Sequence, residues 1–427
     1  GGFLAPGMDF AFGFTGDDYI DRALQNDWLI CSDSVVSPAS SNALEDLQLR
    51  ISLEPIRDLK IDLTANRTRN RSREIQYMFE GMPDTRSGNF SMSIISIGSA
   101  FERPSAGDGY HSGTFERFRR NLDVIRDRVE SQFLGAQYPQ GSTLAGKTFD
   151  PANGTISKHS PDVMIPAFLA AYTGKSARNS ALDFFPSLFS MMPNWRITYT
   201  GLTKIAWFKK NFRSVNLNHA YRSTYSVGSY NTFQSFMSYM GDIGFVEDVQ
   251  SGNPIPSSRF DISMVSINEQ FSPLIGMDAT LKNGLTAKVE YKTSRILNLS
   301  MSACQLVETA SRDFVIGLGY KIVNFNLFSG RNVKDSKNRV SHDLALRADI
   351  SFRNQSALCR DIQQGFAQAT NGNKALKISC SADYTLSRLL TLRLYYDRQQ
   401  NTPLVSSSSY PVVSADFGFS MKFSLTR

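Results

Sequence analysis

Strict alternation of apolar and polar residues is the feature that most constrains how this chain folds. In residues 413–425 the odd positions are apolar, whereas the even positions are small or polar: Ser414, Asp416, Gly418, Ser420, Lys422 and Ser424. Consecutive side chains of a β-strand point to opposite faces, so the pattern predicts a strand with two different faces. Residues 285–292, 342–353 and 376–386 alternate in the same way.

Weaker alternation recurs along the rest of the chain and brings the total to roughly sixteen predicted strands. The further candidates are residues 3–14, 47–53, 59–65, 76–80, 90–97, 195–199, 215–221, 230–240, 260–264, 275–281, 314–322 and 390–396. Many approach the ~9 to 11 residues with which a tilted strand crosses a membrane. The predicted fold class is all-β, an antiparallel transmembrane β-barrel.

The apolar faces have two interpretations. In a soluble barrel or sandwich they would form a core, and in a membrane barrel they would contact lipid. We favour lipid because the strands are long and numerous, because aromatic residues make up 11% of the chain, and because the last strand places Phe423 outward. The longest apolar run, residues 163–172, is interrupted by Pro166 and is shorter than the ~20 residues of a spanning helix.

The alternation also assigns individual residues to a face. The residues predicted to face lipid are Leu285, Val289, Leu344, Leu346, Ile350, Leu376, Ile378, Phe417, Phe419 and Phe423. The residues predicted to face the lumen are Lys288, Glu290, Asp343, Arg347, Asp349, Lys377, Asp383, Asp416 and Lys422. In a membrane barrel these residues would form a hydrated wall of mixed charge.

Helical patterns interrupt the strands in two places and define three predicted regions. Residues 1–99 are predicted to be barrel strands with a short helical insertion at about 15–46. Residues 100–193 are predicted to be a helical and loop insertion that serves as a cap, plug or partner surface, with helices at 114–133, 162–172 and 182–191. Residues 194–427 are predicted to be barrel strands again.

The connections between strands favour the same architecture. Bacterial barrels have short turns on the inner side of the membrane and longer loops outside. Tight turns are predicted on the inner side at 54–58, 282–284 and 386–389. Longer outer connections are predicted at 303–312, 354–373 and 399–412.

No catalytic or metal-binding set emerges from the sequence. The four histidines, His111, His159, His219 and His342, lie far apart and lack the spacing of metal ligands. Gly317 and Gly319 are predicted to relieve crowding inside a strand rather than to cradle a phosphate. We therefore expect no enzymatic activity and no cofactor. The formal net charge of +7 receives little weight.

The four cysteines do not form a recognisable motif. Cys380 is predicted to be a small buried residue on the apolar face of its strand. Cys304 and Cys359 are both expected in outer connections, where they either remain free thiols or form an exposed disulfide. Cys31 stands alone.

A row of arginines continues the apolar register of one predicted strand. After Leu59, Ile61, Leu63 and Ala65 the odd positions become Arg67, Arg69, Arg71 and Arg73. One interpretation is a solvated extension of the strand. The other is contact with anionic lipid headgroups or an acidic partner, because arginine binds phosphate and carboxylate groups bidentately. A nucleic-acid partner is not expected, because the row lacks interleaved aromatic residues.

Four longer strings resemble a known family. They are residues 193–202 (PNWRITYTGL), 217–228 (LNHAYRSTYSVG), 265–276 (VSINEQFSPLIG) and 281–291 (LKNGLTAKVEY). They resemble the C-terminal region of the SprA/Sov family, which forms the outer-membrane translocon of the type IX secretion system in Bacteroidota. The resemblance runs over most of the chain and is densest from 193 to 425.

The resemblance implies a protein-export pore in the outer membrane of a Gram-negative, Bacteroidota-like bacterium. Family members form one very large barrel, so this chain would be a C-terminal portion whose first and last strands pair with the remaining N-terminal part. The implied partners are outer-membrane lipid, a barrel shuttle protein, a plug protein and transiting folded cargo. In gliding species the family also supports gliding motility.

The alternative function is a self-contained porin or nutrient receptor of roughly sixteen strands. It would differ by closing on itself and by passing small solutes. A third candidate, a soluble β-rich surface adhesin, would extract into buffer without detergent.

Overall fold

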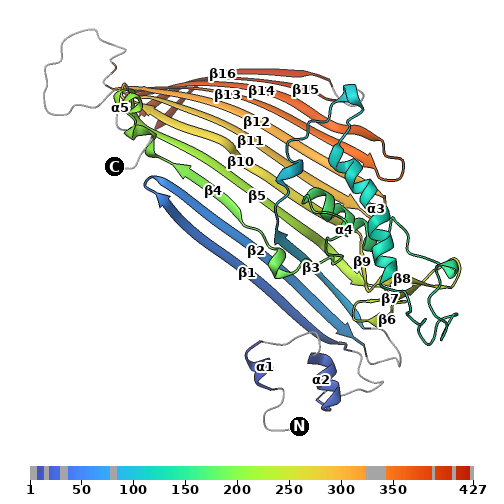
Figure 1. Cartoon of the computed structure of the whole chain (residues 1–427). Coiled ribbons are helices and arrows are strands. Elements are labelled where there is room, and N and C mark those ends of the chain that lie inside the picture. The colour runs from blue at the N-terminus through green and yellow to red at the C-terminus, as the bar shows by residue number, and fades with distance from the viewer. Residues whose placement is uncertain are drawn as a thin grey trace, which may run out of the picture.

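A single large antiparallel sheet dominates the computed structural model of the chain (Figure 1). The structure describes residues 7–13, 19–28, 37–76, 84–323, 325, 343–386, 390–405 and 410–423. The sheet has thirteen strands, and its main path runs β1-β2-β3-β5-β10-β11-β12-β13-β14-β15-β16. The expected all-β class, with helices inserted between strands, is confirmed.

Most strands of this sheet are long, and most neighbours along the chain pair with each other in antiparallel orientation. Their bounds are β1 (Ala39–Ile56), β2 (Leu59–Ile75), β3 (Thr85–Ser93), β4 (Asn194–Tyr199), β5 (Phe212–Thr232), β9 (Phe260–Ile262), β10 (Met264–Leu281), β11 (Leu285–Ser300), β12 (Gln305–Ile322), β13 (Leu344–Asp361), β14 (Ala367–Thr385), β15 (Leu390–Pro403) and β16 (Val412–Phe423).

The strands extend further than the alternation predicts, and this corrects several boundaries. Residues 303–312 and 354–373 are mostly strand, so the β11–β12 and β13–β14 connections are tight turns rather than long outer loops. The predicted strand at 3–14 is also wrong, because α1 (Met8–Ala11) is helical. The N-terminal helical segment is shorter than expected, since α2 (Tyr19–Gln25) is followed by β1 from Ala39.

Two short strands share one place in the sheet. β3 pairs with the C-terminal half of β2 and β4 pairs with its N-terminal half, while β5 pairs with both from the other side. β3 and β4 therefore lie end to end between β2 and β5. The helical insertion, residues 94–193, leaves and re-enters the sheet at this break.

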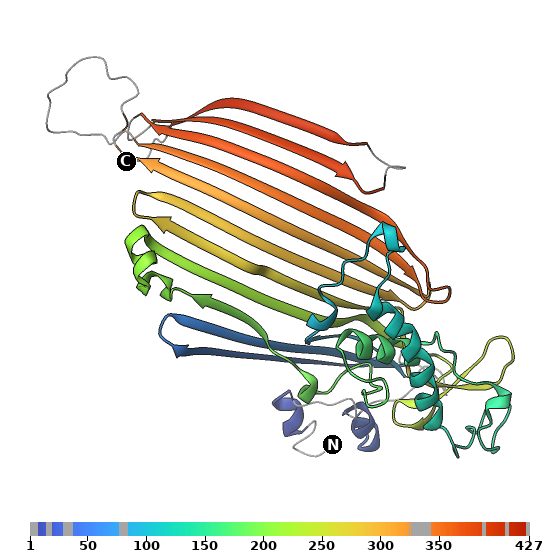
Figure 2. The ribbon, with the colours of Figure 1, turned by 45° about the horizontal axis from the view of Figure 1, so that its top comes forward.

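The insertion contains α3 (Gly113–Ser131) and α4 (Pro161–Tyr172), which pack against each other. Both helices lie over one face of the sheet, near one end of the strands (Figure 2). The helix expected at 182–191 is only a short 3-10 turn, Leu188–Ser190. A separate three-stranded sheet of β6 (Met237–Met240), β7 (Ile243–Glu247) and β8 (Pro254–Ser258) lies at the same end (Figure 1). The short α5 (Ala206–Asn211) lies at the opposite end.

Candidate functional site: the insertion and the sheet face that carries it

Cross-strand pairing divides the sheet into two chemically different faces. Directly paired residues of antiparallel strands point to the same side. Val289 pairs with Ile316, Ile316 with Ile350, and Ile350 with Ile378. All ten residues predicted to face lipid lie on this side, which we call the apolar face.

The opposite side, which we call the polar face, carries the residues predicted to line a lumen. Eight of them lie in strands of this register: Lys288, Glu290, Arg347, Asp349, Lys377, Asp383, Asp416 and Lys422. The ninth, Asp343, precedes β13 and forms an ion pair with Lys321 of the same face, at 2.7 Å. Glu290 lies between Lys288 and Lys292, at 3.0 and 2.9 Å.

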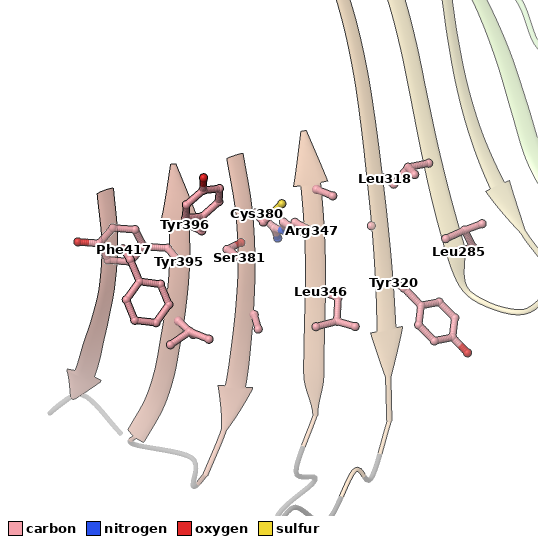
Figure 3. A pocket seen from close by; sticks show the side chains of 14 residues that line it. Leu285, Leu318, Tyr320, Leu346, Arg347, Cys380, Ser381, Tyr395, Tyr396 and Phe417 are labelled. Carbon is pink, nitrogen blue, oxygen red and sulfur yellow. The ribbon is translucent and has the colours of Figure 1, made fainter. Parts of the chain in front are cut away.

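One end of the apolar face is bare. Ile350 is 45% exposed and Phe417 is 72% exposed, and neighbouring strands present similar side chains. A shallow groove crosses this surface from β11 to β16 (Figure 3), with the small residues Ala348, Cys380 and Ala382 between larger apolar side chains. An exposed apolar surface of this extent is typical of a site that contacts lipid or another protein.

The other end of the same face is covered by the insertion. On β11 the register that begins with Leu285 continues to Leu297 and Leu299, which are fully buried. These leucines belong to one apolar core with α3 and α4, to which Phe118, Ile125 and Phe168 contribute. The insertion therefore lies on the apolar face and not on the polar one.

Polar side chains complete the hydrogen bonding at the break between β3 and β4. The Ser93 hydroxyl accepts hydrogen bonds from the Asn66 backbone N–H at 3.0 Å and from the Asn194 side-chain amide at 3.2 Å. The Asn194 side-chain oxygen accepts from the Ser223 backbone N–H at 2.8 Å. These side chains replace backbone hydrogen bonds that an uninterrupted strand would make. The two ends of the insertion, at Ser93 and Asn194, which we call its neck, are therefore hydrogen-bonded to both neighbouring strands.

Two buried ion pairs lie beneath the insertion. Glu269 of β10 and Arg295 of β11 pair at 2.7 Å, and Arg295 also donates to Ser99 of the insertion at 2.7 and 2.8 Å. Ser96 donates to Glu269 at 2.6 Å, as does Tyr221 at 2.9 Å. Both charges are therefore hydrogen-bonded to the insertion as well as to each other, which offsets the cost of burying them.

The second pair repeats this arrangement further along the sheet. Arg360 of β13 donates to Glu308 of β12 at 3.0 Å and to the Tyr110 carbonyl of the insertion at 2.7 Å. Arg312 of β12 donates to the Glu102 carbonyl at 3.1 Å, and Arg119 of α3 donates to the Ile362 carbonyl at 3.1 Å. Charged groups thus hold the insertion to four adjacent strands.

The arginine row lies on the apolar face, directly beyond the apolar residues of β2, as the alternation predicts. Arg67 and Arg71 both pair with Glu45, and Arg73 pairs with Asp21 and Asp84. Arg67 also lies over the ring of Phe90 and Arg69 over that of Phe185. The row is engaged with carboxylates and aromatic rings of its own chain, and contact with headgroups or a partner stays a prediction.

Asp162 and Glu102 of the insertion have pKa values that are shifted in opposite directions. Burial raises the pKa of Asp162, at the start of α4, to about 6, against hydrogen bonds from Ser258 and Ser257 that favour its charged form. Burial also acts to raise the pKa of Glu102, but hydrogen bonds from Ser112 and Thr114 outweigh it and lower the pKa. The ionised form of Asp162 is therefore less well stabilised than that of Glu102, because burial removes it from water.

The cysteine expectations are partly wrong. Cys304, Cys359 and Cys380 are free, so Cys304 and Cys359 do not form a disulfide. Cys359 lies inside β13 and donates to the Gln305 side-chain oxygen at 3.3 Å. Cys380 is on the apolar face as predicted, but it is exposed rather than buried, because that part of the face is bare. Cys31 and His342 lie outside the described residues.

The buried ion pairs were missed in the sequence, although a signal was present. The predicted strands ended before Glu269, Arg295, Glu308 and Arg360, but continuing the register of each strand places all four residues on its apolar side. A charged residue in an apolar register indicates a buried ion pair where another segment covers that part of the face. The partners could not be assigned, because they depend on the register between strands.

Comparisons with known proteins add little to this geometry. No family model matches the chain, and no curated protein matches it. Among solved structures, OmpT, an outer membrane protein from Vibrio cholerae folded in vitro (trimer form), is 9% identical with a TM-score of 0.23, covering 91% of this chain and 99% of its own. A likeness this low bears on neither fold nor function. The described residues contain no group of side chains suited to a metal ion, and none of their helices is long and apolar enough to cross a membrane.

Proposed function

We propose that this chain is part of the wall of an outer-membrane pore that exports folded proteins. The observation that carries the proposal is the division of the sheet into one apolar face, bare over one end of the strands, and one polar face of mixed charge. A sheet of this kind separates lipid from water. The resemblance to the SprA/Sov family supplies the step from a pore to a type IX secretion translocon, with its role in gliding in gliding species.

The character of the polar face supports passage of a protein rather than tight binding of one solute. Its charges are of both signs and many are paired on the face itself, as Arg353 is with Asp313 and Arg393 with Asp383. Such a wall presents no extended apolar surface to which a folded cargo protein would stick.

The edges of the sheet support a barrel larger than the described strands. Within the described part of the chain β1 and β16 each pair on one side only. An open strand edge is not tolerated in lipid, because its backbone groups would lack hydrogen-bond partners. We therefore propose that further strands, from the rest of the same polypeptide, close the barrel.

The position of the insertion supports a docking role beside the barrel. If the bare apolar face contacts lipid, the insertion on that same face lies outside the lumen, so it does not plug the pore. Its own surface exposes Phe189 at 95% and Leu134 at 68%. We propose that this surface contacts the shuttle barrel or the plug protein of the secretion system.

The intact mass of the native polypeptide, extracted with detergent from outer membranes of the source cell, tests the proposal. A chain several times longer than these 427 residues supports one arc of a giant translocon. A chain of about this length would instead favour the self-contained porin. Replacing residues 94–193 by a short turn should abolish partner pull-down and secretion, and unchanged secretion would refute the docking role.

A further inference from the structure

A hollow on the polar face lies beside the break between β3 and β4. It is lined by Arg50 of β1, Asp62 of β2, Arg196 of β4, and Arg222 of β5, with Gln270 of β10 at its rim. The strand pairing sets their order, since Asp62 is opposite Arg196, and Arg222 is opposite Gln270. The hollow is thus lined by three guanidinium groups and one carboxylate.

The single carboxylate of the hollow is shared among several groups, of which Arg50 is the weakest. Asp62 accepts a hydrogen bond from Ser52 at 2.5 Å and forms an ion pair with Lys60 at 3.5 Å. Arg50, Arg196 and Arg222 are all exposed, and none of them forms an ion pair within the described part of the chain. The hollow therefore carries an excess of positive charge.

The rest of the polar face is arranged differently. Lys288, Lys321, Arg353 and Arg393 each have a carboxylate of the same face as a partner. The hollow is thus a positive site in which three cations without ion pairs share one concavity. Concave positive surfaces concentrate the potential and attract anions.

The spacing of the three arginines determines how large an anion must be to contact all of them. Arg50 and Arg222 are three strand spacings apart, or ~14 Å between backbones, and Arg196 lies on the strand next to Arg222. Each guanidinium can bind one carboxylate or phosphate bidentately. A single small anion reaches one or two of these groups, whereas a segment with several acidic side chains reaches all three.

We infer that this hollow binds an acidic polypeptide segment on the water-filled side of the wall. The identity of the segment as part of a passing or docking protein rests on the proposed export function, but binding itself does not require export. Free phosphate groups share the same chemistry, and the experiment separates the two.

Dye-labelled hexa-aspartate titrated into the full-length native protein in detergent, at 0.1 M salt and followed by fluorescence anisotropy, tests the inference. The R196Q/R222Q double variant should bind the peptide at least tenfold more weakly. The matched control is R353Q/R393Q, which removes the same charge from the same face at positions that already have carboxylate partners. It should bind within twofold of the unaltered protein.

Two results would overturn the inference. Equal binding by both double variants would show that the peptide responds only to net charge. Pyrophosphate binding that is lost in R196Q/R222Q, without any such loss for hexa-aspartate, would assign the hollow to a small phosphate. If R196Q/R222Q migrates as an unfolded protein on a semi-native gel, the single variants R196K and R222K are compared instead. They keep the positive charge but lose the bidentate guanidinium, so their affinity for hexa-aspartate should fall threefold or more.

Discussion

The two ends of the apolar face share the same strands and the same register, yet they have opposite environments. At one end Leu318, Ile350 and Phe417 are exposed on a bare apolar surface, and at the other Leu297, Leu299 and Leu306 are fully buried beneath the insertion. The charged residues that are buried in this register lie at the covered end, whereas Lys374 of β14 and Arg398 of β15, on strands that the insertion does not reach, are exposed. The comparison teaches that one face of a strand can be exposed along part of its length and packed against protein along the rest, while the alternation of its side chains stays the same.

The transition between the two ends is marked by buried charge. Glu269 and Arg295 lie where the bare surface gives way to the insertion core. A buried ion pair is tolerated there because Ser96 and Tyr221 donate hydrogen bonds to Glu269 and Ser99 accepts them from Arg295, although the Arg295 Nε has no partner among the described residues. The covered end thus depends on specific hydrogen-bond and ion-pair partners, whereas the bare end consists mainly of apolar side chains.

Breaking the Glu269–Arg295 pair should have the largest effect. Glu269→Ala leaves Arg295 buried without its carboxylate, which should destabilise docking of the insertion by about 3–5 kcal/mol. Limited proteolysis should then cleave within residues 94–193 at a much higher rate. The control is Asp313→Ala on the polar face, whose exposed partner Arg353 contributes only about 0–1 kcal/mol. Equal protease resistance of the two variants would contradict the account.

A charge placed on the bare end should disturb membrane assembly. Ile350→Arg puts a guanidinium in the middle of the apolar surface, at a cost of about 2–4 kcal/mol if that surface faces lipid. Ser351→Arg, one residue further, points to the polar face and should be tolerated. Folding into vesicles, followed by gel mobility, measures both, and a normal yield for Ile350→Arg would count against lipid contact.

Lower pH should stabilise the packing of the insertion at the covered end, where Asp162 lies. The folded-state pKa of Asp162 is raised to about 6 from an ordinary 3.8, so its stabilising contribution is fully present below pH 3.8 and is lost as the pH rises through 6. The difference between pH 4 and pH 8 should reach about 2 kcal/mol. Hydrogen exchange of α4 measures it. Asp162→Asn should flatten this dependence, and an unaltered profile in the variant would show that another group is responsible.

Loosening the neck should have the smallest effect. Asn194→Ala removes the acceptor of the Ser223 N–H and the donor to Ser93, and should cost about 1–3 kcal/mol. The loss should appear as faster hydrogen exchange at β3 and β4 with the insertion core unchanged. Faster exchange throughout α3 would instead mean that the neck and the core unfold together.

The sequence predicted the bare end better than the covered end, for a physical reason. A strand between lipid and water needs only alternation, which is local, so residues such as Val289, Ile350 and Phe417 could be placed on a face without knowing their neighbours. The covered end depends on contacts between distant segments. The pairing of Ser99 with Arg295, or the alignment of β3 with β4, requires strand order and register that no local pattern contains.

The central claim is that the apolar face contacts lipid and the polar face contacts water. Single cysteines at positions 346 to 353 of β13, in a chain whose native cysteines are replaced by serine, would carry spin labels in reconstituted full-length protein. Accessibility to oxygen, which partitions into lipid, should peak at Leu346, Ala348, Ile350 and Phe352, and accessibility to a water-soluble nickel complex at Arg347, Asp349, Ser351 and Arg353. Equal accessibility at all eight positions, or the opposite phase, would contradict the account.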